Sequence, residues 1–81
     1  MNTKTILDQS HAYRICVRGN LGDNWADYFY GVGICRRTME HGALVTELTG
    51  SLADQAVLFD VLQKLYNLGF ELISAERIEP A

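Results

Sequence analysis

The sequence predicts a two-layer α+β domain, in which a four-stranded antiparallel sheet carries two helices on one face. Several short segments alternate apolar and polar residues, which is the pattern of half-buried strands. Two other segments carry apolar residues at helical spacing. The strand-to-helix turn Gly19–Asn24 is also echoed 31 positions later by Gly50–Gln55. The echo indicates two strand-helix-strand halves, produced either by an internal duplication or by two turns that converged on the same residue types.

The first half is predicted to begin with a strand and continue as a short helix. Tyr13, Ile15 and Val17 alternate with polar residues and are expected to face the core. Four apolar residues of the following segment fall on one helical stripe: Leu21, Trp25, Tyr28 and Phe29. Trp25 is expected to be the main contact of this helix with the sheet, and Gly31 is expected to end it.

Both helix starts carry residues that favour capping. Asn20 in the first half and Ser51 in the second are expected to cap the helices with their side-chain oxygens. Asp23 and Asp54 follow three residues later, at the third helical position, where the helix dipole favours a carboxylate.

The rest of the chain is predicted to form a hairpin, a longer helix and a last strand. Val32 and Ile34 begin a strand, residues 36–42 form a polar turn, and Leu44, Thr46 and Leu48 line the next strand. The long helix is expected over 52–68, ended by Gly69. Its predicted apolar side comprises Leu58, Phe59, Val61, Leu62, Leu65 and Tyr66. A last strand runs over 70–78, with an ambiguous register because Leu72 and Ile73 are both apolar.

Right-handed crossovers in both halves would place the third strand between the first and second. This order is the ferredoxin-like arrangement. The alternative is a three-strand meander followed by one long helix and a final strand, in which the first and second strands would be neighbours.

The composition is that of one ordinary globular domain, with 48% apolar and 21% charged residues over 81 positions. We expect a flexible tail over 1–11 and a single domain over 12–81. The chain has no signal-peptide pattern and no apolar run long enough for a membrane span, so a cytoplasmic location is predicted. The net charge of -3 gives no general attraction to nucleic acid or to membranes.

The chain resembles a family of small uncharacterised bacterial proteins of about 80 residues. The resemblance rests on Arg18-Gly19-x-Leu21-x-x-x-Trp25-x-x-Tyr28-Phe29-x-Gly31 in the first half. In the second half it rests on Leu48-Thr49-Gly50-x-x-x-Asp54-Gln55-Ala56-x-Leu58. It implies a shared fold and carries no activity, cofactor or site.

Catalysis is not predicted. His11 and His41 lie in separate segments, Asp23 and Asp54 suit helix starts, and neither cysteine has a base placed beside it. No phosphate-loop, dinucleotide or metal motif occurs, so no cofactor and no metal are expected.

Two surfaces are candidates for binding. The parity of the strands places Arg14, Arg18, Arg37 and Glu47 on the sheet face away from the helices, and Arg77 joins them if the last strand keeps that register. We expect contact with another copy or another protein, and not with a membrane. RNA recognition by the arginines is an alternative, made unlikely by the missing base-stacking aromatics. A sensor of small anions is a second alternative.

The candidate anion site of that sensor is the turn formed by Gly19, Asn20 and Gly22, because amides at a helix start can bind anions.

Overall fold

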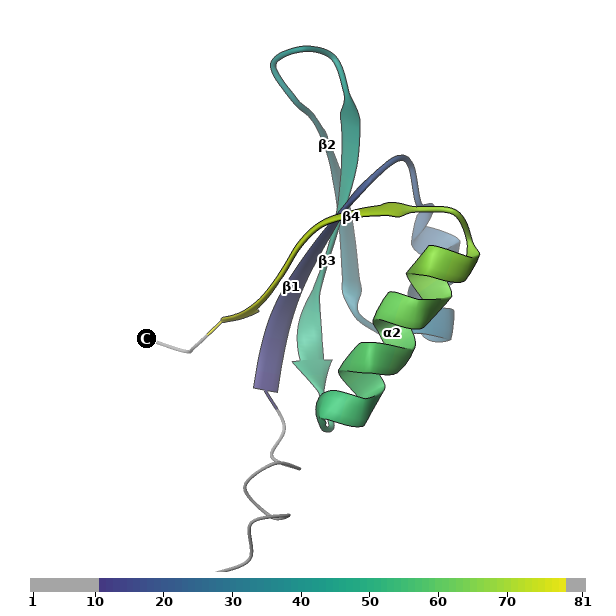
Figure 1. Ribbon diagram of the computed structural model, residues 1–81, viewed down its shortest axis with the longest axis vertical. Helices are drawn as coiled ribbons and strands as arrows, with labels where there is room; N and C mark the ends of the chain where they lie inside the picture. Colours follow the sequence, from purple (N-terminus) through teal and green to yellow (C-terminus); the bar gives the residue numbers. More distant parts are fainter. Residues whose placement is uncertain (1–10, 79–81) are drawn as a thin grey trace, which may run out of the picture.

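The computed structural model describes residues 11–78 and shows one antiparallel sheet with both helices on the same face (Figure 1). The elements are β1 (His11–Arg18), the 3-10 helix η1 (Asp23–Phe29), β2 (Gly33–Thr38), β3 (Leu44–Leu52), α2 (Gln55–Asn67) and β4 (Glu71–Ile78). The strands lie in the order β2-β3-β1-β4, and all three pairings are antiparallel. Strand β3 separates β1 from β2, which confirms the predicted sheet and contradicts the meander.

The predicted tail over 1–11 lies outside the described residues except for His11, which is the first residue of β1. The predicted polar turn over 36–42 is also shorter in the structure, because β2 continues to Thr38. Arg36, Arg37 and Thr38, which were predicted to lie in the turn, therefore belong to β2.

The core lies between the sheet and the two helices. It contains Tyr13, Ile15, Val17, Leu21, Phe29, Val32, Leu48, Leu52, Val61 and Leu65. The inward orientation predicted for Tyr13, Ile15 and Val17 is confirmed. Residues from both helices contribute to one cluster, so each crossover is held by the same core.

The first helix differs from its prediction in type and in contacts. A 3-10 helix has three residues per turn, so a stripe calculated for an α-helix does not apply to it. Phe29 is fully buried, whereas Trp25 is only partly buried and Tyr28 is 47% exposed. Phe29 is therefore the main anchor of η1, a role that was predicted for Trp25, and Trp25 packs against the core without being fully buried. The N-cap is Gly22, without a side-chain cap, so Asn20 does not have its predicted capping role.

The second helix begins three residues later than predicted. Asp54 is itself the N-cap, and its carboxylate accepts a hydrogen bond from the Val57 amide at 2.9 Å. Ser51, the predicted cap, lies within β3. Gly69 follows the C-cap with a φ of 92°, as predicted, and the Phe70 amide donates to the Leu65 carbonyl at 3.0 Å. This pairing is the Schellman ending, which favours glycine.

The buried side of α2 is narrower than the apolar side that was predicted to face the core. Val61 and Leu65 are buried, but Phe59 is 63% exposed and Tyr66 is 75% exposed. These two side chains were expected in the core and lie outside it.

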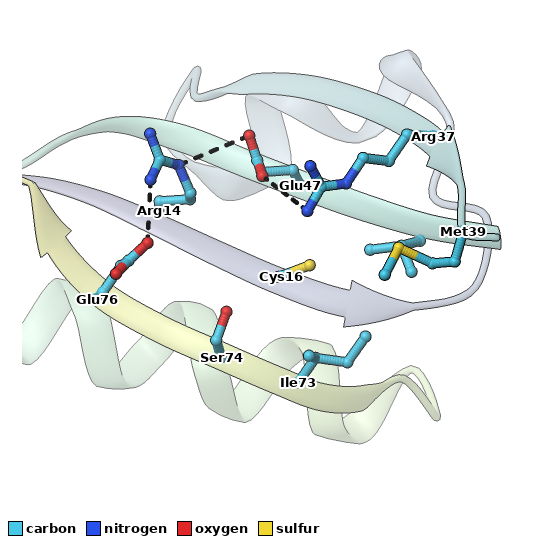
Figure 2. A pocket seen from close by; sticks show the side chains of 9 residues that line it. Arg14, Cys16, Arg37, Met39, Glu47, Ile73, Ser74 and Glu76 are labelled. Atoms are coloured by element: carbon cyan, nitrogen blue, oxygen red, sulfur yellow. Dashed lines mark hydrogen bonds and ion pairs between the residues drawn. The ribbon is translucent and has the colours of Figure 1, made fainter. Parts of the chain in front are cut away.

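A β-bulge settles the register of the last strand. Cys16 pairs with Ser74 and Val17 pairs with Leu72, so Ile73 is an extra residue. Leu72 therefore shares the helix side with Val17, and Ile73 lies beside Ser74 on the open face (Figure 2).

The register also gives Arg77 a different position from the predicted one. It pairs with Tyr13, a core residue, which places Arg77 on the helix side. Its predicted position on the open face was wrong.

Candidate functional site: the open face of the sheet

Charged residues from all four strands meet on the face away from the helices. Arg14 Nη1 lies 3.0 Å from Glu76 Oε1, and Arg14 Nε lies 3.7 Å from Glu47 Oε1. Glu47 Oε2 also lies 3.8 Å from Arg37 Nη2. Figure 2 shows that Glu47 lies between the two arginines. The structure thus brings together three of the predicted residues and adds Glu76, which the prediction missed.

Arg18 belongs to a separate pair on this face. Its Nε lies 3.4 Å from Glu71 Oε1, and both side chains are well exposed. Surface pairs of this kind contribute about 0–1 kcal/mol. The predicted arginine face is therefore a ladder of cross-strand ion pairs in which Arg14, Arg18 and Arg37 each face a carboxylate.

A hollow of about 370 Å³ lies in the middle of this face (Figure 2). Cys16 and Val45 line it and are 5% and 2% exposed. Met39 and Ile73 line it from the β2–β3 turn and from the bulge. Val45 follows the same alternation as Glu47 and was detectable in the sequence. Ile73 was not, because only pairing with β1 reveals the bulge.

Two amides of the predicted anion-binding turn donate to the protein's own oxygen atoms. The Gly19 amide donates to the Leu44 carbonyl at 2.8 Å, and the Leu21 amide donates to Thr46 Oγ1 at 3.0 Å. Thr46 Oγ1 in turn donates to the Gly19 carbonyl at 2.6 Å. This turn, with Asn20 and Gly22, fastens η1 to β3.

A carboxylate also lies at this turn. Asp23 Oδ1 accepts a hydrogen bond from Arg36 Nη1 at 2.8 Å, which lowers the pKa of Asp23. The same guanidinium donates to the Leu21 carbonyl at 2.9 Å. The Gly19 and Leu21 amides and the Arg36 guanidinium already donate to groups of the protein, so the geometry does not favour an anion at this turn.

The two cysteines lie on β1 and β2, the two strands that flank β3. Cys16 and Cys35 each pair with Glu47, and both thiols are free. Two strand spacings of about 4.8 Å separate their α-carbons by roughly 10 Å. A disulfide needs about 7 Å or less. Within residues 11–78, no group of three or more His, Cys, Asp or Glu side chains is arranged to hold a metal ion.

The family of this chain is indicated by one comparison. The family described as a domain of unknown function (DUF8691) matches residues 12–76. The chain belongs to this family. The match extends from β1 into β4, and membership assigns no activity. No match was found among curated proteins or among solved structures. In the described part of the chain, neither helix has the length and apolar character that a bilayer crossing requires.

Proposed function

We propose that this chain is a non-catalytic binding module that associates with a second copy of itself through α2 and β4. The observation that carries the proposal is the exposure of large apolar side chains on these two elements. Phe59 and Tyr66 of α2 are 63% and 75% exposed, and Leu72, on the helix side of β4, is 51% exposed. Figure 1 shows α2 beside β4, on the near side of the molecule, while η1 lies farther away.

The exposed side of α2 carries no charge. The helix has two charged residues, Asp60 and Lys64, and both face η1. Asp60 accepts a hydrogen bond from the Tyr30 hydroxyl, and Lys64 Nζ lies 4.5 Å from the centre of the Tyr28 ring. Aromatic enrichment and depletion of charge are characteristic of interface cores. Two copies of a chain with a net charge of -3 repel each other. A neutral surface is therefore the part of the chain at which they can meet without repulsion.

The two aromatic rings of α2 supply part of the area that a symmetric dimer needs. Aromatic side chains bury about 150–250 Å² each, so the two α2 rings would contribute roughly 300 Å² at their observed exposure. A stable interface needs about 800 Å² from each partner. The free edge of β4, the last strand of the sheet, supplies a further pairing surface. Antiparallel pairing of two identical edges is compatible with a two-fold axis.

The alternatives receive less support. RNA binding needs several unopposed cations, and the three arginines of the open face lie against carboxylates. The bacterial origin and the cytoplasmic location stay predictions, as does the absence of a cofactor.

Sedimentation velocity tests the proposal. We expect the parent to sediment as a dimer at about 100 µM, a concentration at which a micromolar complex is nearly complete. A Phe59→Gln, Tyr66→Gln double variant should sediment as a monomer with an unchanged circular-dichroism spectrum. Met39→Gln, which changes an exposed side chain in the β2–β3 turn, is the matched control and should stay dimeric. A monomeric parent, or a double variant that still dimerises, would contradict the proposal.

A titration with single-stranded RNA separates the RNA alternative. At about 150 mM salt we expect no binding in the micromolar range. Micromolar binding that is lost in an Arg18→Glu, Arg37→Glu variant would favour RNA recognition over self-association.

A further inference from the structure

The hollow on the open face has the size and the lining of a small-ligand site. Its volume of about 370 Å³ lies at the lower end of the range for such sites, about 300–1,000 Å³. Its floor is apolar: Cys16 and Val45 are 5% and 2% exposed although both helices lie on the other face. The longer side chains around them therefore shield them from water.

The apolar end of the hollow is formed by two side chains that lie near each other in Figure 2. Met39 comes from the turn after β2, and Ile73 comes from the bulge of β4. Without the bulge, Ile73 would continue the strict alternation of β4 and would not share a face with Ser74. Methionine adapts to different shapes, so this end suits an aliphatic or thioether chain of variable length.

The polar end contains equal numbers of positive and negative groups. Arg14 is held by Glu76 at 3.0 Å, whereas Arg37 is 3.8 Å from Glu47 and its side chain is 60% exposed. Arg37 is thus the more loosely paired guanidinium, and exposed pairs of this kind exchange partners at little cost. A ligand with only a negative or only a positive group would leave the site with one uncompensated charge. A zwitterion would not.

We propose that this hollow binds a free α-amino acid with an apolar side chain. The ligand carboxylate pairs with Arg37, for which a guanidinium provides two parallel hydrogen bonds. The ligand ammonium lies against Glu47 and Glu76, and the apolar side chain lies over Cys16 and Val45 toward Met39 and Ile73. The site takes Ile73 and Glu76 from β4, but Arg37 lies on β2 at the opposite edge of the sheet, so replacing Arg37 leaves the proposed dimer surface of α2 and β4 unchanged.

Titration of the ¹⁵N-labelled protein with L-leucine tests the assignment. We expect saturable shifts of the Cys16 and Val45 amide signals. Three related probes remove one feature each: glycine lacks the apolar chain, 4-methylpentanoate lacks the ammonium group, and 3-methylbutylamine lacks the carboxylate. Each should bind at least about tenfold more weakly, the factor that corresponds to one modest interaction. Equal affinity for the carboxylic acid and for leucine would identify a simple anion site and overturn the zwitterion assignment.

Variants of the same face provide the second arm. Arg37→Gln should weaken leucine binding about tenfold or more, the loss expected for one ion pair with the ligand. Arg18→Gln, which changes the neighbouring Arg18–Glu71 pair and does not line the hollow, should bind leucine as the parent does. The proposal fails if leucine produces no saturable shift in the parent, or if Arg37→Gln binds it unchanged. Sedimentation of Arg37→Gln should match the parent, which separates this result from the test of self-association.

Discussion

The two helices make equivalent crossovers but use their apolar residues differently. The seven-residue η1 buries Phe29 completely, packs Trp25 against the core and pairs Asp23 with Arg36 of β2. The thirteen-residue α2 buries Val61 and Leu65 and leaves Phe59 and Tyr66 exposed. The shorter crossover buries its phenylalanine completely, whereas the longer one leaves a phenylalanine and a tyrosine exposed, which we assign to contact with a partner.

The ends of the helices explain part of this difference. Helix α2 has its own side-chain cap at Asp54 and its own glycine ending at Gly69. Helix η1 has no side-chain cap, and the turn before it is tied to β3 through Thr46 and to β2 through Arg36. Both ends of α2 are therefore satisfied within the helix and its own turns, whereas the start of η1 depends on side chains of the sheet.

The two glycines of the repeated motif show the same contrast. Gly19 follows β1 with a φ of +120°, where glycine is favoured. Gly50 lies within β3, and a Cβ there would come within 3.1 Å of Val32. One glycine allows a turn and the other allows close packing, so the echoed segments are not structurally equivalent.

The largest expected effect compares one phenylalanine from each helix. Phe29→Ala should lower the free energy of unfolding by about 3–5 kcal/mol, because it leaves a cavity in the core. Phe59→Ala should change it by less than about 0.5 kcal/mol in the monomer, as for most surface positions. Urea unfolding followed by circular dichroism at low protein concentration measures both. Similar losses of unfolding free energy for the two variants would show that Phe59 contributes to the core as Phe29 does.

A smaller effect is expected where η1 is tied to β3. Thr46 is fully buried and joins the Leu21 amide to the Gly19 carbonyl. Thr46→Val keeps the shape of the side chain and removes both hydrogen bonds, which should cost about 1–3 kcal/mol. Thr49→Val, on the other face of the same strand, is the control and should cost less. If both variants unfold at the same urea concentration, the polar attachment of η1 is not needed.

The smallest effect concerns the contact between the two helices. Hydrogen bonds from Tyr30, and then from Lys64, lower the pKa of Asp60 in the folded protein. The stabilisation is therefore present above the ordinary carboxyl pKa of about 4 and is lost as the pH falls through the folded value. Asp60→Asn should melt at a lower temperature than the parent at pH 7, and the gap should narrow toward about pH 2, where the parent carboxylate is protonated.

Asp27→Asn, at an exposed position of η1, is the control for that comparison. The difference in melting temperature between Asp27→Asn and the parent should be small, and it should be the same whether or not Asp60 is also replaced. A gap for Asp60→Asn that stays constant from pH 7 to pH 2 would exclude ionisation of Asp60 as the cause.

Much of the sheet could be predicted because alternation is a local property. The inward set of β1 and the outward positions of Arg14 and Glu47 follow from the two-residue period. The glycine ending of α2 is also local. The charge partners could not be predicted in the same way, since Glu76 reaches Arg14 from a strand 62 positions away. Neither could the 3-10 geometry of η1, because its apolar residues fit an α-helical stripe equally well.

The sequence by itself determined which residues alternate and where a glycine ends the second helix, and it left two strand orders open. Only the tertiary structure decided which side chains of β4 and α2 are buried. A single extra residue opposite β1 puts Ile73 beside Ser74 and turns Arg77 to the helix side. Likewise, α2 has a wider apolar arc than its contacts with the sheet and with η1 can cover. Burial is a property of the partner surface as well as of the segment, so periodicity alone could not distinguish Phe59 from Val61.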